Sequence, residues 1–232
     1  MSTEVETDHH WARRTQERGA LTRQALLDSA LQEFAAAGFD AASTRAIAAR
    51  AGVRQGQLTY HFESKDVLWR ATVDQLFERF DVEFGAALEP GPDADPASTL
   101  ARSIRALVRS VSRLPELNRI MVHEATADSE RLAWIVETHV RARFEQLGTL
   151  WREVRESGGT ELDADPVIIY YTLVGAASLL YVNAAEARRL LGQEGPDDVI
   201  SDSLIEAHAD TLVAMLLGRN ASQPDTRKTK GS

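Results

Sequence analysis

The segment that decides the fold lies at residues 43–68 and reads STRAIAARAGVRQGQLTYHFESKDVL. Two short runs with apolar residues at helical spacing flank Gly52, and the first run follows Ser43, a residue type that favours helix N-caps. The small residues Ala48 and Ala51, together with the glycine, allow two helices to cross at a steep angle. The pattern therefore predicts a helix-turn-helix over these residues.

This helix-turn-helix leaves many polar side chains on its outer surface. Ile47, Val53 and Leu58 form the expected small core. The hydrogen-bonding side chains around the start of the second helix are Arg45, Gln55, Gln57, Thr59, Tyr60 and His61. Such groups suit base edges and phosphates in the major groove of DNA. The alternative interpretation is an ordinary solvated face of a helical domain.

The charge of the chain is distributed unevenly. The net charge of the 232 residues is −9, which by itself disfavours nucleic acid as a partner. Residues 9–70, however, hold nine basic and six acidic side chains, a balance of +3, and the remainder carries −12. A basic head on an acidic body is typical of a nucleic-acid-binding module joined to a module of another kind. Chance asymmetry is the alternative explanation.

The whole chain predicts an all-α fold of about nine helices, because apolar residues recur at helical spacing and alternating strand patterns are scarce. The first helix is expected to end at Gly38, and Ser64 is expected to cap a long fourth helix that continues to about Ala87. The later predicted helices are 98–112, 115–126, 129–157, 165–191 and 196–218.

The composition suggests four segments and a place in the cell. The expected segments are a flexible leader at 1–18, the helix-turn-helix domain at 19–66, a larger helical domain at 67–218 and a disordered tail at 219–232. Cysteine is absent, which fits a reducing cytoplasm. The leader lacks the apolar core of a signal peptide, and the longest apolar stretch is shorter than the roughly 20 residues that span a bilayer. We therefore expect a cytoplasmic protein without a membrane partner.

Residues 22–70 resemble the TetR (tetracycline repressor) family of transcription regulators. The resemblance rests on LLDSALQEFAAAGF in the first helix, on STRAIAARAGV, and on GQLTYHFESKDVL with its His61-Phe62 and Ser64-Lys65 pairs. It implies an N-terminal three-helix DNA-binding domain followed by a larger helical domain for ligand binding and dimerisation. It also implies a sequence-specific regulator, by family habit a repressor, with no cofactor and no enzymatic activity.

Carried over by position, the resemblance implies particular DNA contacts. Arg45 would reach a base, and the segment from Gln55 through Gly56 to Gln57 would begin the recognition helix in the groove. The residues implied to bind phosphates are Thr44, Tyr60, His61 and Lys65, the last being the only lysine before residue 228. Thr59 stands where the family commonly has a tyrosine, so that aromatic contact is lost or moved to the next residue. For His61 a helix cap without a role in DNA binding is the alternative.

Two helices of the body are predicted to form a homodimer. The helix at 165–191 carries small residues at 175–178, which allow another helix to approach closely. The last helix offers an apolar side formed by Leu204, Ala207, Leu212, Met215 and Leu216. These two helices would form a four-helix bundle with a second copy. Such a dimer would bind a palindromic operator in double-stranded DNA, with half-site centres about 34 Å apart or a multiple of that distance. The alternative is an intramolecular core.

A pocket for a small-molecule effector is expected inside the larger domain. Its candidate apolar residues are Phe80, Phe84, Leu117, Met121, Trp134, Phe144, Trp151 and Tyr171, and its candidate polar residues are Glu124, Asn183 and His123. Ordinary core packing is the alternative for each aromatic residue and methionine. The effector is expected to be small and largely apolar, and to release the protein from DNA.

The sequence lacks complete versions of several common enzyme motifs. His123 and Glu124 begin a metalloprotease-like pattern, but Ala127 occupies the place of its second histidine. Neither a Gly-x-Ser-x-Gly elbow nor a phosphate-binding loop is present. We therefore expect neither an enzyme nor a metal site. A helical homodimeric scaffold or adaptor that does not bind DNA is the alternative.

Overall fold

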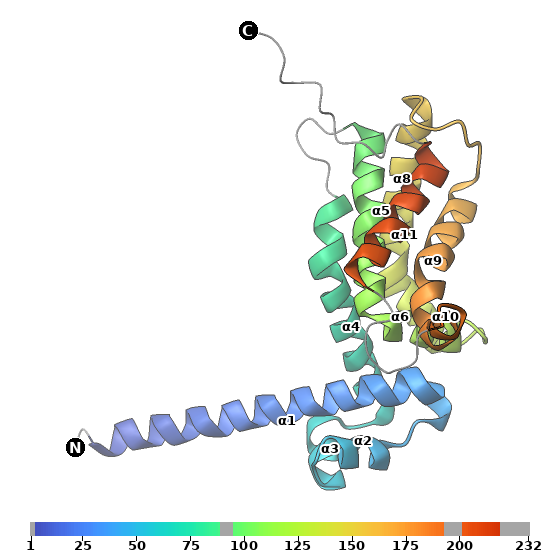
Figure 1. Cartoon of the computed structure of the whole chain (residues 1–232). Coiled ribbons are helices and arrows are strands. Elements are labelled where there is room, and N and C mark those ends of the chain that lie inside the picture. The colour runs from blue at the N-terminus through green and yellow to red at the C-terminus, as the bar shows by residue number, and fades with distance from the viewer. Residues whose placement is uncertain (1–2, 89–94, 193–200, 219–232) are drawn as a thin grey trace. The chain divides into compact units, whose positions relative to one another are not determined.

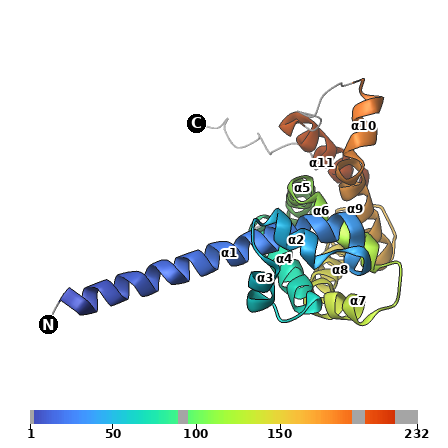
Figure 2. The same cartoon turned by 90° about the horizontal axis from the view of Figure 1, so that it is seen from below.

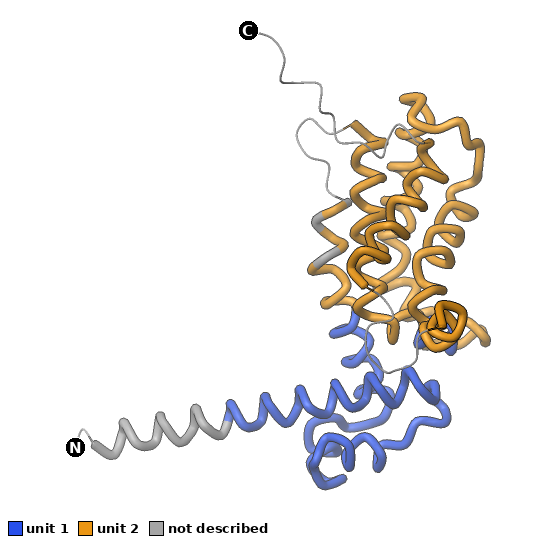
Figure 3. Tube along the Cα trace, viewed as in Figure 1, with its two compact units in different colours: residues 1–76, 119–124 blue, residues 77–118, 125–232 orange. Residues whose placement is uncertain are grey.

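The computed structural model describes residues 3–88, 95–192 and 201–218. Within these ranges the secondary structure consists of eleven α-helices and one π-helical turn (Figure 1), so the prediction of an all-α fold is confirmed. The chain forms two compact units, one from residues 1–76 and 119–124 and the other from 77–118 and 125–232 (Figure 3). The tail expected at 219–232 lies outside the described residues.

The first unit contains the predicted helix-turn-helix. Its helices are α1 (Thr3–Ala41), α2 (Thr44–Arg50), α3 (Gln55–His61), the first part of α4 (Lys65–Leu88) and the end of α6 (Pro115–Glu124). The short helix α2 packs against both α1 and α3 (Figure 1). The buried core of this unit includes Leu27, Ala30, Phe34, Ile47, Leu58, Phe62, Leu68 and Trp69. The apolar stripe of α1 thus covers the helix-turn-helix from one side.

The predicted caps at Ser43 and Ser64 are confirmed, whereas α1 continues past the predicted end at Gly38, where it is kinked, to Ala41. The Ser43 hydroxyl accepts a hydrogen bond from the Ala46 amide at 3.3 Å, and the Ser64 hydroxyl accepts one from the Val67 amide at 3.1 Å. Both bonds satisfy amides at the start of a helix that have no partner within it. Gly52 has a φ of 70°, which an L-amino acid with a side chain rarely adopts, and so it makes the turn between α2 and α3.

The boundary between the units differs from the expected one at residues 66 and 67. Leu68, Trp69 and Val73 of α4 are buried in the first unit, where Phe39 meets the Trp69 ring edge-on at 6.1 Å. The end of α6 also belongs to this unit. These contacts join residues far apart in the sequence, and the position of the helix-turn-helix motif alone does not reveal them.

The leader also differs from the expectation of a flexible segment at 1–18. From Thr3 onward these residues belong to α1, which is 39 residues long. No proline or glycine precedes Gly19, so nothing in the chemistry of the backbone stops the helix before that point. Composition indicated that the leader lacks an apolar core, but it did not reveal that the helix continues through it.

The second unit is built around α5 (Pro96–Arg113). Its other elements are the rest of α4, the start of α6, α7 (Glu130–Ile135), the π-helical turn η1 (Val136–Val140), α8 (Arg141–Glu156), α9 (Pro166–Val182), α10 (Ala184–Leu190) and α11 (Asp202–Leu217). Helix α5 packs against α8, α9 and α11. Its core residues Leu100, Ile104 and Val108 are at most 1% exposed. The apolar face of α5 therefore forms the centre of this unit.

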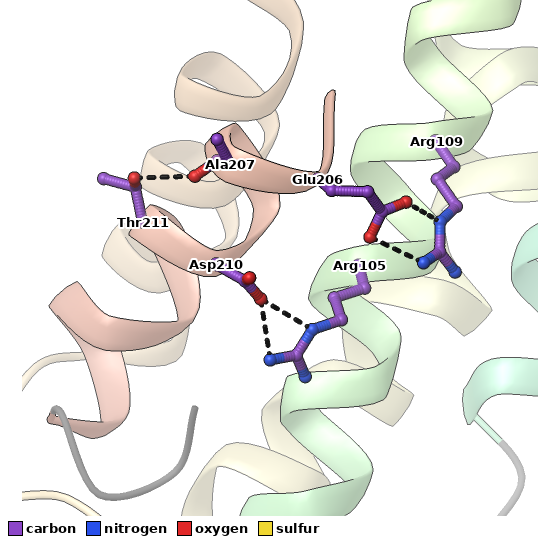
Figure 4. Close-up of polar contacts among 6 residues, drawn as sticks. All are labelled: Arg105, Arg109, Glu206, Ala207, Asp210 and Thr211. Atoms are coloured by element: carbon purple, nitrogen blue, oxygen red, sulfur yellow. Dashed lines mark hydrogen bonds and ion pairs between the residues drawn. The ribbon is translucent and has the colours of Figure 1, made fainter. Parts of the chain in front are cut away.

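Polar side chains fix α11 on α5 and α9. Arg109 donates from Nε and Nη2 to the two carboxylate oxygens of Glu206 at 2.6 and 2.7 Å, and Arg105 donates twice to Asp210 at 3.0 and 2.9 Å (Figure 4). The hydroxyl of Tyr181 on α9 lies 3.0 Å from Nδ1 of His208 on α11. Helices α9 and α11 thus lie side by side (Figure 2).

Two helices that were predicted as continuous are interrupted. The stretch at 129–157 contains the turn η1, in which the Arg141 amide donates to the Val136 carbonyl five residues earlier. The stretch at 165–191 breaks at Asn183, whose φ of −98° and ψ of 29° leave the helical region. Helices α9 and α10 meet there at 69°. Apolar periodicity continues across both interruptions, so it did not reveal them.

The described helices differ in length and in apolar character. None of them by itself is both long and apolar enough to cross a membrane, and only the bent pair α9 and α10 reaches that length and composition when counted together.

Candidate DNA-binding site

The predicted contact surface begins at the first turn of α3. The backbone amide of Arg54 donates to Oε1 of Gln57 at 3.2 Å, so the glutamine side chain folds back over the start of the helix. A Cβ added at Gly56 would meet no atom within 4 Å. The backbone of this turn is therefore open, and a nucleic acid can approach it closely.

The starts of α2 and α3 are linked by side chains. Nε2 of Gln55 donates to Oγ1 of Thr44 at 3.2 Å, although the two residues lie eleven positions apart. Arg45, the second residue of α2, is exposed beside this link. The structure thus brings together three of the predicted DNA-binding residues from two helices. Arginine is the residue that most often reads guanine in the major groove.

The end of α3 presents an exposed aromatic residue. Tyr60 is 85% exposed and meets the His61 ring edge-on at 5.3 Å. The hydroxyl of Thr59 donates to the Gln55 carbonyl at 3.2 Å, so this donor is used within the helix itself. His61 is half-buried and lies next to the buried Phe62. Tyr60 therefore offers the free phenol of this turn, which fits the predicted shift of the aromatic contact from Thr59.

Lys65 is held by the end of α1. Its Nζ donates to the Asp40 carbonyl at 3.1 Å and lies 4.8 Å from the centre of the Phe39 ring. The sequence predicted a phosphate contact here but not this anchorage. An ammonium group has three donors, so the bond to the carbonyl leaves capacity for an anion.

One basic residue near the predicted surface was missed from the sequence. The guanidinium carbon of Arg23, on α1, lies 5.3 Å from the ring centre of Phe62, which ends α3. The side chain is exposed, so it adds a positive charge beside the end of the recognition helix. Arg23 was counted in the basic head, but only tertiary packing places it there.

The candidate effector residues do not gather as a single group. Phe80, Leu117 and Trp151 are buried in the second unit, where Phe84, Trp134 and Phe144 are partly buried. Met121 and Glu124 belong to the first unit. Trp151 donates from its ring nitrogen to the Ala164 carbonyl at 2.8 Å, as a core tryptophan does.

Two of the candidates are corrected by the structure. Tyr171 is 69% exposed and therefore does not line an interior in this structure. Asn183 is also exposed and lies at the junction of α9 and α10, where it ends one helix and begins the next. Helical periodicity alone did not distinguish an inward from an outward position in a helix that is apolar on nearly every side.

His123, a third polar candidate, lies against the end of α1. A Cβ added at Gly38 would stand 3.2 Å from Nδ1 of this histidine. The close approach requires a glycine, as does the φ of 72° at that position. His123 therefore packs at the turn after α1 and belongs to the first unit.

Known proteins share both sequence and fold with this chain. A family model of bacterial regulatory proteins, the tetR family, matches residues 26–72. The regulator TtgR of Pseudomonas putida is 28% identical over 214 residues, which cover 88% of this chain and 95% of that protein. A protein of Escherichia coli described as "Probable acrEF/envCD operon repressor" is 26% identical over 167 residues, covering 68% of this chain and 74% of its own.

Solved structures agree in fold. AibR in complex with isovaleryl coenzyme A and operator DNA has a TM-score of 0.67 at 21% identity, over 85% of this chain and 98% of that chain. A TetR-like transcriptional regulator from Rhodococcus has a TM-score of 0.60 at 22% identity, over 84% of this chain and 92% of that chain. These likenesses extend through the second unit, beyond the residues that the family model matches.

Proposed function

The chain belongs to the tetR family of bacterial transcriptional regulators, and from this premise we propose that it is a repressor that binds a palindromic operator as a homodimer. The observation that carries the proposal is the open first turn of α3, where Gly56 leaves the backbone free and Gln55 joins Thr44 beside the exposed Arg45. Groups suited to bases and phosphates lie together at the starts of two adjacent short helices, which supports recognition in the major groove.

A second copy of the chain is the proposed partner of α9. This helix exposes Ile168, Tyr171 and Leu179, and Gly175 is exposed between them. Their spacing of three, four and four residues places them on one face of the helix. On the neighbouring α11, Met215 is also exposed. Exposed apolar strips of this kind mark association surfaces, and a twofold dimer supplies the two recognition helices that a palindrome requires.

The proposed effector is a small, largely apolar molecule that binds in the second unit and releases the operator. Phe80 and Phe84 of α4 are in ring contact at 4.8 Å, and Trp134 is only partly buried. The relative AibR was solved with isovaleryl coenzyme A, whose acyl group is small and apolar. Because α4 begins directly after α3, a change in its position would act on the recognition helix.

The test is a selection of bound sequences from random DNA duplexes with the purified full chain, at a stated salt concentration, because phosphate contacts make affinity depend on salt. The expected result is an enriched palindrome whose half-sites are about one helical turn apart or a multiple of it. A single half-site would contradict the dimer. A folded protein that enriches no sequence would contradict specific DNA binding and would favour a helical scaffold.

A further inference from the structure

Arg143 of α8 uses all three guanidinium nitrogens in contacts with α4 and with the turn before α8. Arg143 donates from Nε to Oδ1 of Asp81 at 3.2 Å, and its Nη2 contacts both oxygens of the same carboxylate. Its remaining nitrogen, Nη1, donates to the backbone carbonyl of His139. The guanidinium carbon lies 5.2 Å from the ring centre of Phe77, also on α4. Arg143 therefore holds α4 through both a carboxylate and an aromatic face.

Three aromatic rings lie in contact with one another beside this arginine. Phe77 stacks on the His139 imidazole with ring centres 4.3 Å apart and planes inclined by only 2°. Trp134 meets the same imidazole edge-on at 5.2 Å. His139 lies in the π-helical turn Val136–Val140, and π turns inside α-helices occur frequently at functional sites. A charged group is thus joined to an aromatic surface at an irregular point of the helix.

The link is accessible and exchangeable. Helix α4 is held by buried apolar side chains such as Phe77 and Phe80, whereas the Arg143–Asp81 pair is partly exposed. The side chain of Asp81 is 43% exposed and that of Arg143 is 23% exposed. An ion pair that water reaches contributes little net stability, so another carboxylate can replace that of Asp81 at small cost.

We propose that Arg143 is the anchor for the acidic group of the effector, a small carboxylic acid with an apolar body. The effector carboxylate takes the place of Asp81 on the planar guanidinium, and its apolar body lies beside the half-buried rings of His139 and Trp134. Asp81 remains on α4 and turns toward solvent as an unpaired carboxylate, so the exchange adds the one negative charge of the effector. It also removes the charged link between α8 and α4.

This proposal rests on the proposed function, because it names the chemistry of the effector and the residue pair through which it acts. Helix α4 is continuous from Lys65 to Leu88, and α3 ends at His61. A change at Asp81 therefore acts on the same helix that follows the recognition helix.

The test is isothermal titration calorimetry of the full chain with hexanoate, decanoate and benzoate, each compared with the neutral primary alcohol of the same skeleton. At least one acid is expected to bind at least tenfold more tightly than its alcohol. The Asp81→Asn variant should bind that acid about fivefold more tightly than the unaltered chain, because the internal competitor is gone. The Arg143→Gln variant should lose the preference for the acid and keep its affinity for the alcohol.

Circular dichroism checks that each variant folds. If Arg143→Gln does not fold, the comparison of the unaltered chain with Asp81→Asn still tests the proposal. Equal affinities for acid and alcohol in both the unaltered chain and Asp81→Asn would overturn the proposal, as would a failure of every acid to bind either protein. An acid preference that survives in Arg143→Gln would also overturn it. The selection of operator sequences is carried out without effector. If it enriches a palindrome, the proposed function stands even when the effector proposal is overturned. If acids bind through Arg143 but no operator sequence is enriched, specific DNA binding is contradicted and the proposed role of Arg143 stands.

Discussion

At the scale of the residue, the DNA-binding surface depends on a few side chains with different degrees of freedom. Gln55, Gln57 and Lys65 are each held by a partner within the first unit, whereas Arg45 and Tyr60 are exposed. A side chain that is already fixed loses less conformational entropy when it binds than a free one does. The glutamines therefore position the surface, and the arginine is the residue best placed to discriminate bases.

Replacing Arg45 by alanine tests this assignment. We expect a loss of about 1–3 kcal/mol in binding to the selected operator and a much smaller loss on random DNA. Fluorescence anisotropy with both duplexes measures the two affinities. Arg152→Ala, which removes an exposed arginine of the second unit, is the control and should change neither. An equal loss on both duplexes would make Arg45 a phosphate contact only.

Substitution by alanine is expected to affect stability at one glycine and DNA binding at another. Gly38→Ala should destabilise the fold by about 1–3 kcal/mol, because φ is 72° there and the new Cβ would stand 3.2 Å from Nδ1 of His123. Gly56→Ala should not destabilise it, because nothing lies within 4 Å, but it should weaken operator binding by closing the first turn of α3. Urea unfolding and anisotropy separate the two effects. Equal stability of both variants would contradict the role of Gly38.

At the scale of the element, α11 is fixed by polar contacts that set its position and by apolar burial that stabilises it. The pairs Arg109–Glu206 and Arg105–Asp210 are partly exposed, and such pairs contribute about 0–1 kcal/mol each (Figure 4). The hydrogen bonds from Arg109 lower the pKa of Glu206, which keeps this carboxylate charged. Ala209 and Val213, by contrast, are fully buried, and their burial supplies most of the stabilisation.

The partial burial of His208 beside Tyr181 makes stability depend on pH. Burial lowers the pKa of His208 from its ordinary value of 6.5, although a backbone hydrogen bond at Ala176 opposes this in part, and burial raises the pKa of Tyr181 to about 12. Below pH 6.5 the unfolded chain takes up a proton before the folded chain does, so stability falls from there through the lower folded pKa. We expect His208→Asn to remove this loss, as measured by urea unfolding between pH 5 and 8. An unchanged slope would contradict the assignment.

At the scale of the whole molecule, the two units carry different parts of the proposed function. The first carries the DNA-binding surface, and the second carries the exposed apolar face of α9 together with the Arg143–Asp81 pair. A repressor of this kind needs a dimer because one recognition helix contacts too few bases for specific binding. The proposed dimer and the proposed DNA-binding surface would therefore act together, although their named residues belong to different units.

Leu179→Glu tests the proposed dimer. The side chain is 62% exposed, so the folded protomer should tolerate a charge, but burial of two carboxylates in the twofold interface should weaken association by about 2 kcal/mol or more. Sedimentation velocity measures the association. Val82→Glu, an equally drastic change at an 81% exposed position of α4, is the control and should leave the dimer intact. A dimer that survives Leu179→Glu would place the interface elsewhere.

The sequence by itself determined the helix-turn-helix, its caps at Ser43 and Ser64 and its glycine turn at Gly52, because each depends on contacts among neighbouring residues. The recognition residues that the motif suggests stay a prediction. Only the tertiary structure decided which faces of α9 are buried, where the predicted helices 129–157 and 165–191 are interrupted, and that Arg143 meets Asp81. Those outcomes depend on contacts between residues far apart in the chain, and local periodicity carries no information about them.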